Sequence, residues 1–342
     1  MLFHSIVIDM VIRKIIKGLR PGQPEFERGK KLRFWRSAFH DVYNITAPLV
    51  LQPEVHPLPA GELKIGASTY ILGRRERRRD AREAAVVWFK KGPGFWLLDK
   101  SMPIIRGEDP FVTKIHDADG SWIVVGTVVV DWPADKNNET ALAWRTEFRK
   151  GRTIAELRTA LRQAPFAVGP KNMKDIRLTG LADGSIAVFT RPQGKVGGLG
   201  KIGFTKIRSL DELKPGKLRA APIIEGLFKE EEWGGANEIH VLDTDHVGVL
   251  GHVACMTVGP HGEKIRHYRA MAFVFNHRTR QFSKYKIIAS RADFPRGGAK
   301  HTTLKDVIFT GGLVRHADGT ASLYVGLSDR EAGVKKIKDP FI

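Results

Sequence analysis

The chain has 342 residues, of which 42% are hydrophobic and 27% charged, a composition that excludes a disordered or fibrous protein. The formal net charge of +19 favours contact with polyanions, with the densest basic cluster in GRRERRRDAR from Gly73. No zinc finger, RNP aromatic pair or basic recognition helix accompanies it, so we expect a generally basic surface and no specific nucleic-acid partner. Cys255 is the single cysteine, which excludes an intramolecular disulfide and favours a cytoplasmic location.

The N-terminal residues form an expected extension over 1–30. Met1–Ile8 is apolar, but Asp9 and Arg13 interrupt the run, and neither a preceding basic region nor a small-residue cleavage site marks a signal peptide. The run is also too short and too charged to span a membrane. We therefore expect one domain over 31–342, preceded by this extension.

The rest of the chain alternates short runs rich in Val, Ile, Phe and Tyr with Gly/Asp turn clusters, which predicts an all-β protein. Helical periodicity is limited to Thr153–Ala164. Five strands that follow a turn resemble one another: STYILGR from Ser68, SWIVVGT from Ser121, SIAVFTR from Ser185, HVGVLGH from His246 and TASLYVG from Thr320. They recur roughly every 50 to 75 residues, the length of a propeller blade, and so predict a five-bladed β-propeller.

The strand before each of these turns opens with a polar or acidic residue. The segments are DVYNITAPL from Asp41, EDPFVTKI from Glu108, KDIRLTGL from Lys174, NEIHVL from Asn237 and KDVIFTGGL from Lys305. The start of the first strand of a hairpin lies beside the end of the second. Asp41, Asp109, Asp175, Glu238 and Asp306 are therefore expected to share one end of the blades with Arg74, Thr127, Arg191, His252 and Gly326. This end is a candidate site, although polar residues also flank strands on ordinary surfaces.

Such a set of acids, arginines and a histidine suits sugar and phosphate chemistry. Phosphorolysis needs one general acid and cations for phosphate, for which the arginine fork is well shaped. Hydrolysis instead requires two carboxylates that flank the bond. The basic members of the set favour phosphate. Asp109 is the best candidate for the acid because Pro110 fixes the backbone after it, although Glu-Asp-Pro can also be a plain acidic turn.

Other motifs carry less information. No HExxH or comparable histidine pair is present, so no metal and no cofactor are expected. The glycine-rich segment KVGGLGKIG (Lys195–Gly203) lacks the Walker pattern, and we expect a mobile loop over the mouth that can touch phosphate. Trp233 either stacks on a sugar or packs under a loop.

Several motifs, taken together, resemble one enzyme family. GEDPFVTKI resembles the EDP signature of the β-mannoside phosphorylases of glycoside hydrolase family 130, and LGR, GPKNMKDIRL, FTRP, LGH, HYR and YVGLSD follow in a similar order. DVYNITAP, KDIRL with FTRPQG, EWGGANEI with GVLGH, and DVIFTGGL are similar to the related mannosyltransferase–phosphorylases of β-1,2-mannan (mannogen) metabolism. The resemblance runs from about Asp41 to the C-terminus.

This resemblance implies a five-bladed propeller that reversibly transfers mannose, with inversion, between a β-1,2-linked oligomannoside and inorganic phosphate. The product would be α-mannose 1-phosphate, and GDP-mannose is a possible donor. Asp109 falls on the catalytic aspartate, which acts through a sugar hydroxyl. The implied phosphate ligands are Arg74, Lys174, Arg191, His252 and Tyr268. Asn44 and Asp329 match mannose ligands, and the repeat positions Asp175, Glu238 and Asp306 complete the expected substrate-binding set.

The sequence departs from the family pattern at three positions. Lys174 stands where many of these enzymes have arginine, Phe111 replaces an arginine after EDP, and Arg75 stands where an apolar residue is expected. These changes bear on substrate length and donor. Two alternatives stay open: a glycoside hydrolase with Asp175 or Glu238 as base, and a non-catalytic carbohydrate-binding propeller. Reaction direction, glycan length and oligomeric state are not specified by the sequence.

Overall fold

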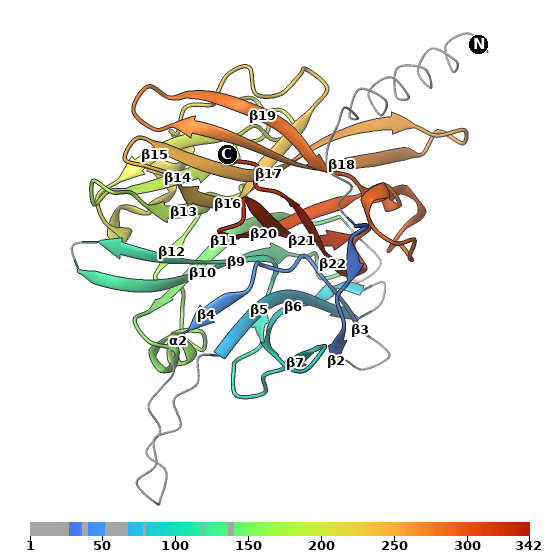
Figure 1. The fold of residues 1–342 in the computed structure, drawn as a ribbon, viewed down its shortest axis with the longest axis horizontal. Coiled ribbons are helices and arrows are strands. Elements are labelled where there is room, and N and C mark those ends of the chain that lie inside the picture. Colours follow the sequence, from blue (N-terminus) through green and yellow to red (C-terminus); the bar gives the residue numbers. More distant parts are fainter. Residues whose placement is uncertain (1–26, 36–39, 52–67, 78–79, 118, 136–139) are drawn as a thin grey trace, which may run out of the picture.

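Each of the five predicted hairpins forms the two inner strands of one sheet. The five sheets are the blades of a five-bladed β-propeller (Figure 1). The pairs are β3 (His40–Tyr43) with β5 (Ser68–Arg77), β9 (Glu108–Asp117) with β10 (Gly120–Asp131), β13 (Arg177–Gly180) with β14 (Ile186–Thr190), β16 (Trp233–Val241) with β17 (His246–Val258), and β20 (Ile308–Arg315) with β21 (Thr320–Leu327). All five pairs are antiparallel. The prediction of the fold is confirmed.

The outer strands complete the blades. They are β2 (Phe34–Trp35), β6 (Asp80–Lys91), β7 (Trp96–Leu98) and β8 (Ile105–Arg106) in the first blade, β11 (Ala143–Gly151) and β12 (Ala167–Val168) in the second, β15 (Gly203–Ile207) in the third, β18 (Lys264–Asn276) and β19 (Gln281–Ala289) in the fourth, and β1 (Lys30–Lys31) and β22 (Glu331–Lys338) in the fifth. In the first blade β4 (Leu49–Leu51) continues the inner strand, since it pairs with β5 on the same edge as β3. The third blade has three strands. A single bridge from Gly203 to Ile223 stands in for the fourth, since Pro222 lacks the N–H that a longer ladder needs.

The computed structural model describes residues 27–35, 40–51, 68–77, 80–117, 119–135 and 140–342. Most of the expected extension over 1–30 lies outside these residues. The predicted helical segment contains α2 (Ile154–Ala160), which begins after Thr153, whose hydroxyl accepts a hydrogen bond from the Glu156 amide at 3.1 Å. The other short helices are α3 (Pro215–Arg219), η1 (Leu210–Glu212), η2 (Arg291–Asp293) and η3 (Thr302–Leu304). In these ranges no helix combines the length and apolar character needed to cross a membrane.

The two ends of the described chain meet in the fifth blade, where β1 pairs with β22. Lys30 lies opposite Val334, Lys31 lies opposite Gly333, and the Leu32 amide donates to the Ala332 carbonyl at 2.9 Å. The strand thus begins at Lys30, the last residue of the expected extension. This pairing closes the ring of blades.

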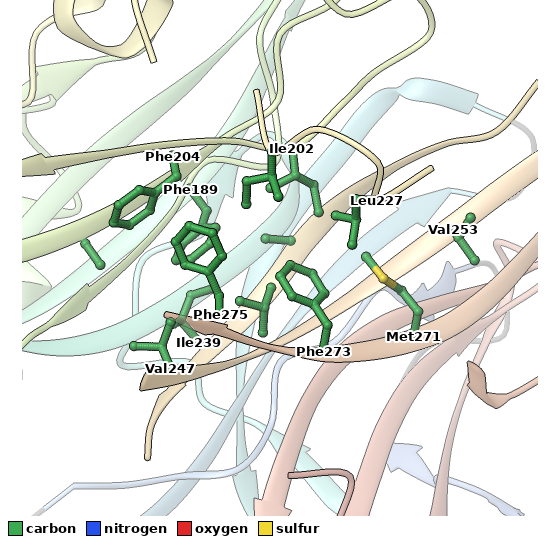
Figure 2. Close-up of a cluster of buried hydrophobic side chains, with 14 of the residues drawn as sticks. Phe189, Ile202, Phe204, Leu227, Ile239, Val247, Val253, Met271, Phe273 and Phe275 are labelled. Carbon is green, nitrogen blue, oxygen red and sulfur yellow. The ribbon is translucent and has the colours of Figure 1, made fainter. Parts of the chain in front are cut away.

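Aromatic side chains fill the space between neighbouring blades, as Figure 2 shows for the third and fourth. The rings of Phe189, Phe204 and Phe275 lie 4.8 to 5.6 Å apart, each with at most 1% of its surface exposed. Close packing of these buried rings fixes the angle between the two blades. It therefore also fixes where the inner strand of each blade begins, which is where the polar residues gather.

Candidate active site

All five blades contribute to a cavity of about 290 Å³ at the ends of the inner strands. Its lining consists of Asn44, Arg74, Asp109, Lys174, Asp175, Arg191, His252, Arg266, Tyr268, Leu304, Val307, Phe309 and Asp329. The volume is at the lower end of that of small-molecule sites. Most of the residues singled out in the sequence are thereby brought together.

Strand register explains this gathering. Arg74 at the end of β5 lies opposite Tyr43, and His252 in β17 lies opposite Gly235. Asp175, just before β13, lies 3.4 Å from the guanidinium of Arg191, just after β14. The expected meeting of hairpin start and hairpin end is thus observed for Asp175 and Arg191. The expected partners of Arg74 and His252 are displaced along their strands, since Asp41 lies opposite Glu76 and Glu238 lies opposite Leu250, and neither acid is part of the cavity lining.

Four of the lining residues have a left-handed backbone. The φ angles are 46° at Asn44, 47° at Asp109, 56° at Asp175 and 51° at Asp329. Asn and Asp tolerate this region better than other residues with a side chain. Asp109 also lies in a β-bulge of β9, where the register shifts between Gly126 and Val128 of the partner strand. Bulges turn side chains away from the regular alternation, here into the cavity.

Asp109 is a buried carboxylate held by three neighbours. Its Oδ1 accepts a hydrogen bond from Asn44 Nδ2 at 2.7 Å, its Oδ2 accepts one from Lys174 Nζ at 3.1 Å, and Arg74 Nη1 lies 3.8 Å away. Burial alone raises the pKa of Asp109, but the charges of Lys174 and Arg74 and these hydrogen bonds outweigh it and hold the pKa well below its usual range. The carboxylate is ionised at neutral pH.

The guanidinium of Arg74 is paired with the carboxylates of Glu76 and Glu108. Its Nε and Nη2 donate to Glu76 at 3.0 and 2.6 Å, and its Nη1 lies 2.7 Å from Glu108. Its guanidinium also lies over the Tyr43 ring, 5.0 Å from the centroid. Burial raises the pKa of Glu108, with Arg74 opposing and Asp109 adding to this rise. The network holds Arg74 in a fixed position at the cavity wall. We call Asn44, Asp109 and Asp329, with Arg74 among them, the acidic wall.

The third and fourth blades form the opposite side, which we call the basic wall; it comprises Lys174, Asp175, Arg191, His252 and Tyr268. Arg191 donates from Nε to the Gly234 carbonyl at 2.9 Å and from Nη2 to the Leu199 carbonyl at 3.1 Å. These bonds fix the guanidinium, whose Nη1 lies 3.4 Å from Asp175 Oδ2.

His252 and Tyr268 stack with their ring centroids 5.5 Å apart. His252 Nδ1 lies 2.8 Å from Asn237 Oδ1, and Tyr268 Oη accepts a hydrogen bond from Trp233 Nε1 at 3.3 Å. Burial, together with the charges of Arg191 and Lys174, lowers the pKa of His252 to about 3. The imidazole is therefore neutral at physiological pH, and the Tyr268 hydroxyl hydrogen is free for a ligand.

The acidic wall also has groups free for a ligand. Asn44 Oδ1 is buried and has no hydrogen-bond partner in the part of the chain that the structure describes. Burial raises the pKa of Asp329; Arg74 opposes this rise, and Asp109 adds to it. Both side chains line the cavity and offer acceptors for hydroxyl groups.

Glu238 and Asp306 do not reach the cavity lining. β16 begins at Trp233, four residues before the expected opening at Asn237, and a bulge at Asn237 turns that side chain toward His252. Glu238 consequently accepts a hydrogen bond from the Leu313 amide at 2.6 Å, between two blades.

The carboxylate of Asp306 instead faces β18. Its Oδ2 lies 2.7 Å from both His267 Nδ1 and Arg269 Nη2. These pairs hold it outside the cavity. Trp233 is 5% exposed and packs against Tyr268, so of its two expected roles the packing role is the one observed.

Arg266 is a lining residue that the sequence analysis missed. It is exposed and forms no ion pair with another described residue. Because alternate residues of a strand share a face, its position two residues before Tyr268 on β18 was the available signal. The apolar residues Leu304, Val307 and Phe309, from η3 and the start of β20, were also missed.

The glycine-rich segment forms a folded turn beside the basic wall. The amides and carbonyls of Gly194 and Gly198 bond reciprocally at 2.8 Å, and Leu199 holds Arg191 through its carbonyl. The segment thus supports Arg191 and is not part of the cavity lining. Across the described ranges, no three His, Cys, Asp or Glu side chains form a group that could hold a metal ion.

Comparisons with known proteins extend this picture. A family model described as "Protein of unknown function (DUF1861)" matches residues 20–342. A search of curated proteins finds no match.

Among solved structures, the chain is similar to MPT-1, a GDP-Man-dependent mannosyltransferase from Leishmania mexicana, with 31% identity, coverage of 97% of this chain and 95% of that one, and a TM-score of 0.79. It is similar to MPT-4, a mannose phosphorylase from Leishmania mexicana in complex with phosphate ion, with 26% identity, coverage of 98% and 93%, and a TM-score of 0.79. A glycosyl hydrolase from Bacteroides ovatus shares the fold, with 11% identity, coverage of 87% and 84%, and a TM-score of 0.52.

Proposed function

Since the chain belongs to the DUF1861 family and to the mannosyltransferase–phosphorylases related to glycoside hydrolase family 130, we propose that it transfers mannose between a β-mannoside and phosphate. One observation carries the proposal. The buried carboxylate of Asp109 is hydrogen-bonded both to Asn44, on the wall suited to sugar hydroxyls, and to Lys174, on the wall suited to an anion.

The acidic wall binds the sugar and the basic wall binds the phosphate. Asn44 and Asp329 hold the mannosyl unit at the cleaved bond by accepting hydrogen bonds from its hydroxyl groups. Lys174, Arg191 and Tyr268 donate to the phosphate, with His252 beside them, and Arg74 keeps Asp109 in place. Lys174 bridges both halves, because its Nζ lies 3.1 Å from Asp109.

Asp109 moves the proton. In phosphorolysis the departing glycosidic oxygen needs a proton, which Asp109 supplies through a sugar hydroxyl. In synthesis the same carboxylate accepts the proton of the acceptor hydroxyl. Its lowered pKa fits the synthetic direction in the free protein, and a bound phosphate raises that pKa because it offsets the charge of Lys174.

The finer assignment follows from the family. We propose a β-1,2 linkage, inversion at the anomeric carbon and α-mannose 1-phosphate as the product. The relatives include a phosphorylase and a GDP-Man-dependent transferase, so GDP-mannose is the second donor to examine. A basic wall that holds phosphate also suits the β-phosphate of a sugar nucleotide.

The test is incubation of the full chain with β-1,2-mannobiose and β-1,2-mannotriose, with and without phosphate, and separation of the products. We expect α-mannose 1-phosphate only when phosphate is present. Free mannose without phosphate would instead identify a hydrolase, with Asp175 as the candidate base in the cavity. If neither substrate reacts and GDP-mannose transfers no mannose to either, the proposal is wrong.

A further inference from the structure

Asp175 is a buried carboxylate whose oxygens make no hydrogen bond. Only 1% of the residue is exposed, neither Oδ1 nor Oδ2 has a hydrogen-bond partner among the described residues, and the side chain lines the cavity. Burying a charged acceptor without a donor is costly. A ligand that brings a hydrogen to this position therefore gains a strong interaction.

Two arginines balance the charge of Asp175 without satisfying its lone pairs. Arg191 Nη1 lies 3.4 Å from Oδ2 and Arg177 Nη2 lies 3.9 Å from Oδ1, while both guanidinium groups donate hydrogen bonds elsewhere. Arg177 Nε bonds the Asn237 carbonyl at 2.8 Å. The two guanidinium groups thus place positive charge beside the carboxylate without donating a hydrogen bond to it.

The backbone around Asp175 preserves this arrangement. Its φ of 56° turns the side chain toward the cavity, and Gly235 faces it from β16. A Cβ at Gly235 would lie 2.9 Å from Asp175 Oδ2 and 3.0 Å from the Cδ of Arg191. The glycine leaves the room that the pair occupies.

The position of Asp175 on the basic wall identifies the group it meets. Lys174 precedes it, Arg191 lies beside it, and His252 is close enough for its charge to act on the imidazole. The sugar-facing residues gather instead around Arg74 across the cavity. A carboxylate beside the cationic side chains that bind an anion is explained if the bound anion carries a hydrogen that the carboxylate can accept.

We propose that Asp175 determines anion specificity by accepting the hydroxyl hydrogen of a bound monohydrogen oxyanion. Hydrogen phosphate and hydrogen arsenate carry such a hydroxyl group at neutral pH, whereas sulfate carries none. Sulfate oxygens would face the carboxylate as bare acceptors, so the site rejects sulfate despite its equal charge and similar shape. This inference rests on the proposed function, because it takes the basic wall as the phosphate site.

The test is calorimetric titration of the full chain at pH 7.5 with phosphate, arsenate and sulfate. We expect phosphate and arsenate to bind within about tenfold of each other and sulfate at least about 100-fold more weakly, the cost of one unmatched charged acceptor. Binding of sulfate within tenfold of phosphate would overturn the inference without recourse to any variant.

Asp175→Asn supplies the second arm, since an amide can donate to sulfate. We expect this variant to bind sulfate and phosphate within about tenfold of each other. Asp211→Asn, the same charge change at an exposed residue outside the cavity lining, should keep the wild-type ratio. If Asp175→Asn keeps the wild-type selectivity and only raises the KM for the oligomannoside, Asp175 is a sugar ligand and the inference is wrong.

Failure of the inference and of the proposed function are distinguishable. Phosphate-dependent release of mannose 1-phosphate that sulfate inhibits as strongly as arsenate refutes the role of Asp175 and leaves the function intact. Selective phosphate binding without any mannosyl transfer refutes the proposed function and leaves the role of Asp175 intact.

Discussion

The negative charge of Asp109 is stabilised by neighbouring side chains and not by water. Only 3% of the residue is exposed, and Lys174, Arg74 and Asn44 together keep its pKa low against the effect of burial. Any change in these neighbours alters the pKa of the residue that we propose to move the proton. Chemistry and electrostatics are therefore coupled at a single carboxylate.

Asp109→Asn tests the role of this carboxylate. The amide is of the same size and also tolerates the left-handed backbone, so we expect the fold to persist while kcat for phosphorolysis falls at least about 100-fold, the usual scale of acid catalysis. Product release is measured by chromatography and folding by circular dichroism. Asp211→Asn serves as the matched control. Activity near that of the wild type would remove Asp109 from the mechanism.

His252 makes the stability of the protein depend on pH. Burial lowers its folded pKa to about 3, below the unfolded value of about 6.5. As pH falls below 6.5, the unfolded chain takes up this proton before the folded chain does. The free energy of unfolding therefore decreases toward pH 3, by about 2 kcal/mol at pH 5 from this residue.

Denaturant unfolding at pH 7.5 and pH 5 in phosphate-free buffer measures this effect. We expect His252→Gln to lose a smaller part of its stability between these two pH values than the wild type does. His261→Gln, at an exposed loop position, should follow the wild type. Equal pH dependence in all three proteins would show that His252 is not the group that titrates.

At the scale of the strands, Gly235 connects sheet geometry to the basic wall. Gly235→Ala places a Cβ within 3.0 Å of both Asp175 and Arg191, neither of which has room to move. We expect a loss of about 1–3 kcal/mol in stability and a rise of at least tenfold in the KM for phosphate. Thermal unfolding and initial rates measure the two effects. Gly216→Ala, in α3, where an added Cβ meets nothing within 4 Å, should not lower the stability and should leave the KM for phosphate unchanged.

The hairpins were predictable because each has an alternating pattern bounded by turn residues. The positions of Asp109, Asp175, Arg191 and His252 at one end of the blades followed from that pattern alone. The bulge at Asn237 was not predictable, since one extra residue in a strand leaves no mark on composition. It is the reason that Asn237, and not Glu238, reaches toward His252.

At the scale of the whole molecule, β1 closes the propeller by joining the last blade. The sequence pattern placed a boundary near this point but could not predict the pairing, because a two-residue strand such as Lys30–Lys31 has no periodicity to detect. The closure depends on backbone bonds to β22 and on the Leu32 amide, supported by the ion pair of Lys31 with Glu331 at 2.9 Å.

Two shortened chains measure the value of this closure. A chain that begins at Glu27 retains β1, and one that begins at Phe34 lacks it. Loss of several backbone hydrogen bonds should lower the thermal midpoint of the second chain by at least about 5 °C relative to the first. Lys31→Met, which removes only the partly exposed ion pair, should shift the midpoint by less than about 2 °C. Equal midpoints for the two shortened chains would mean that the ring is held closed without β1.

The left-handed backbone at Asn44, Asp109, Asp175 and Asp329 limits how this enzyme can evolve. Asn, Asp and Gly are the residues that enter this conformation with least cost, so mutation can exchange carboxylate for amide, or delete the side chain, while the loop keeps its shape. A change to Glu, Ser or a branched residue alters backbone preference and chemistry together. Descendants of this chain that acquire new substrates should therefore vary the walls around these four positions, such as Arg266 and Phe309, before the positions themselves.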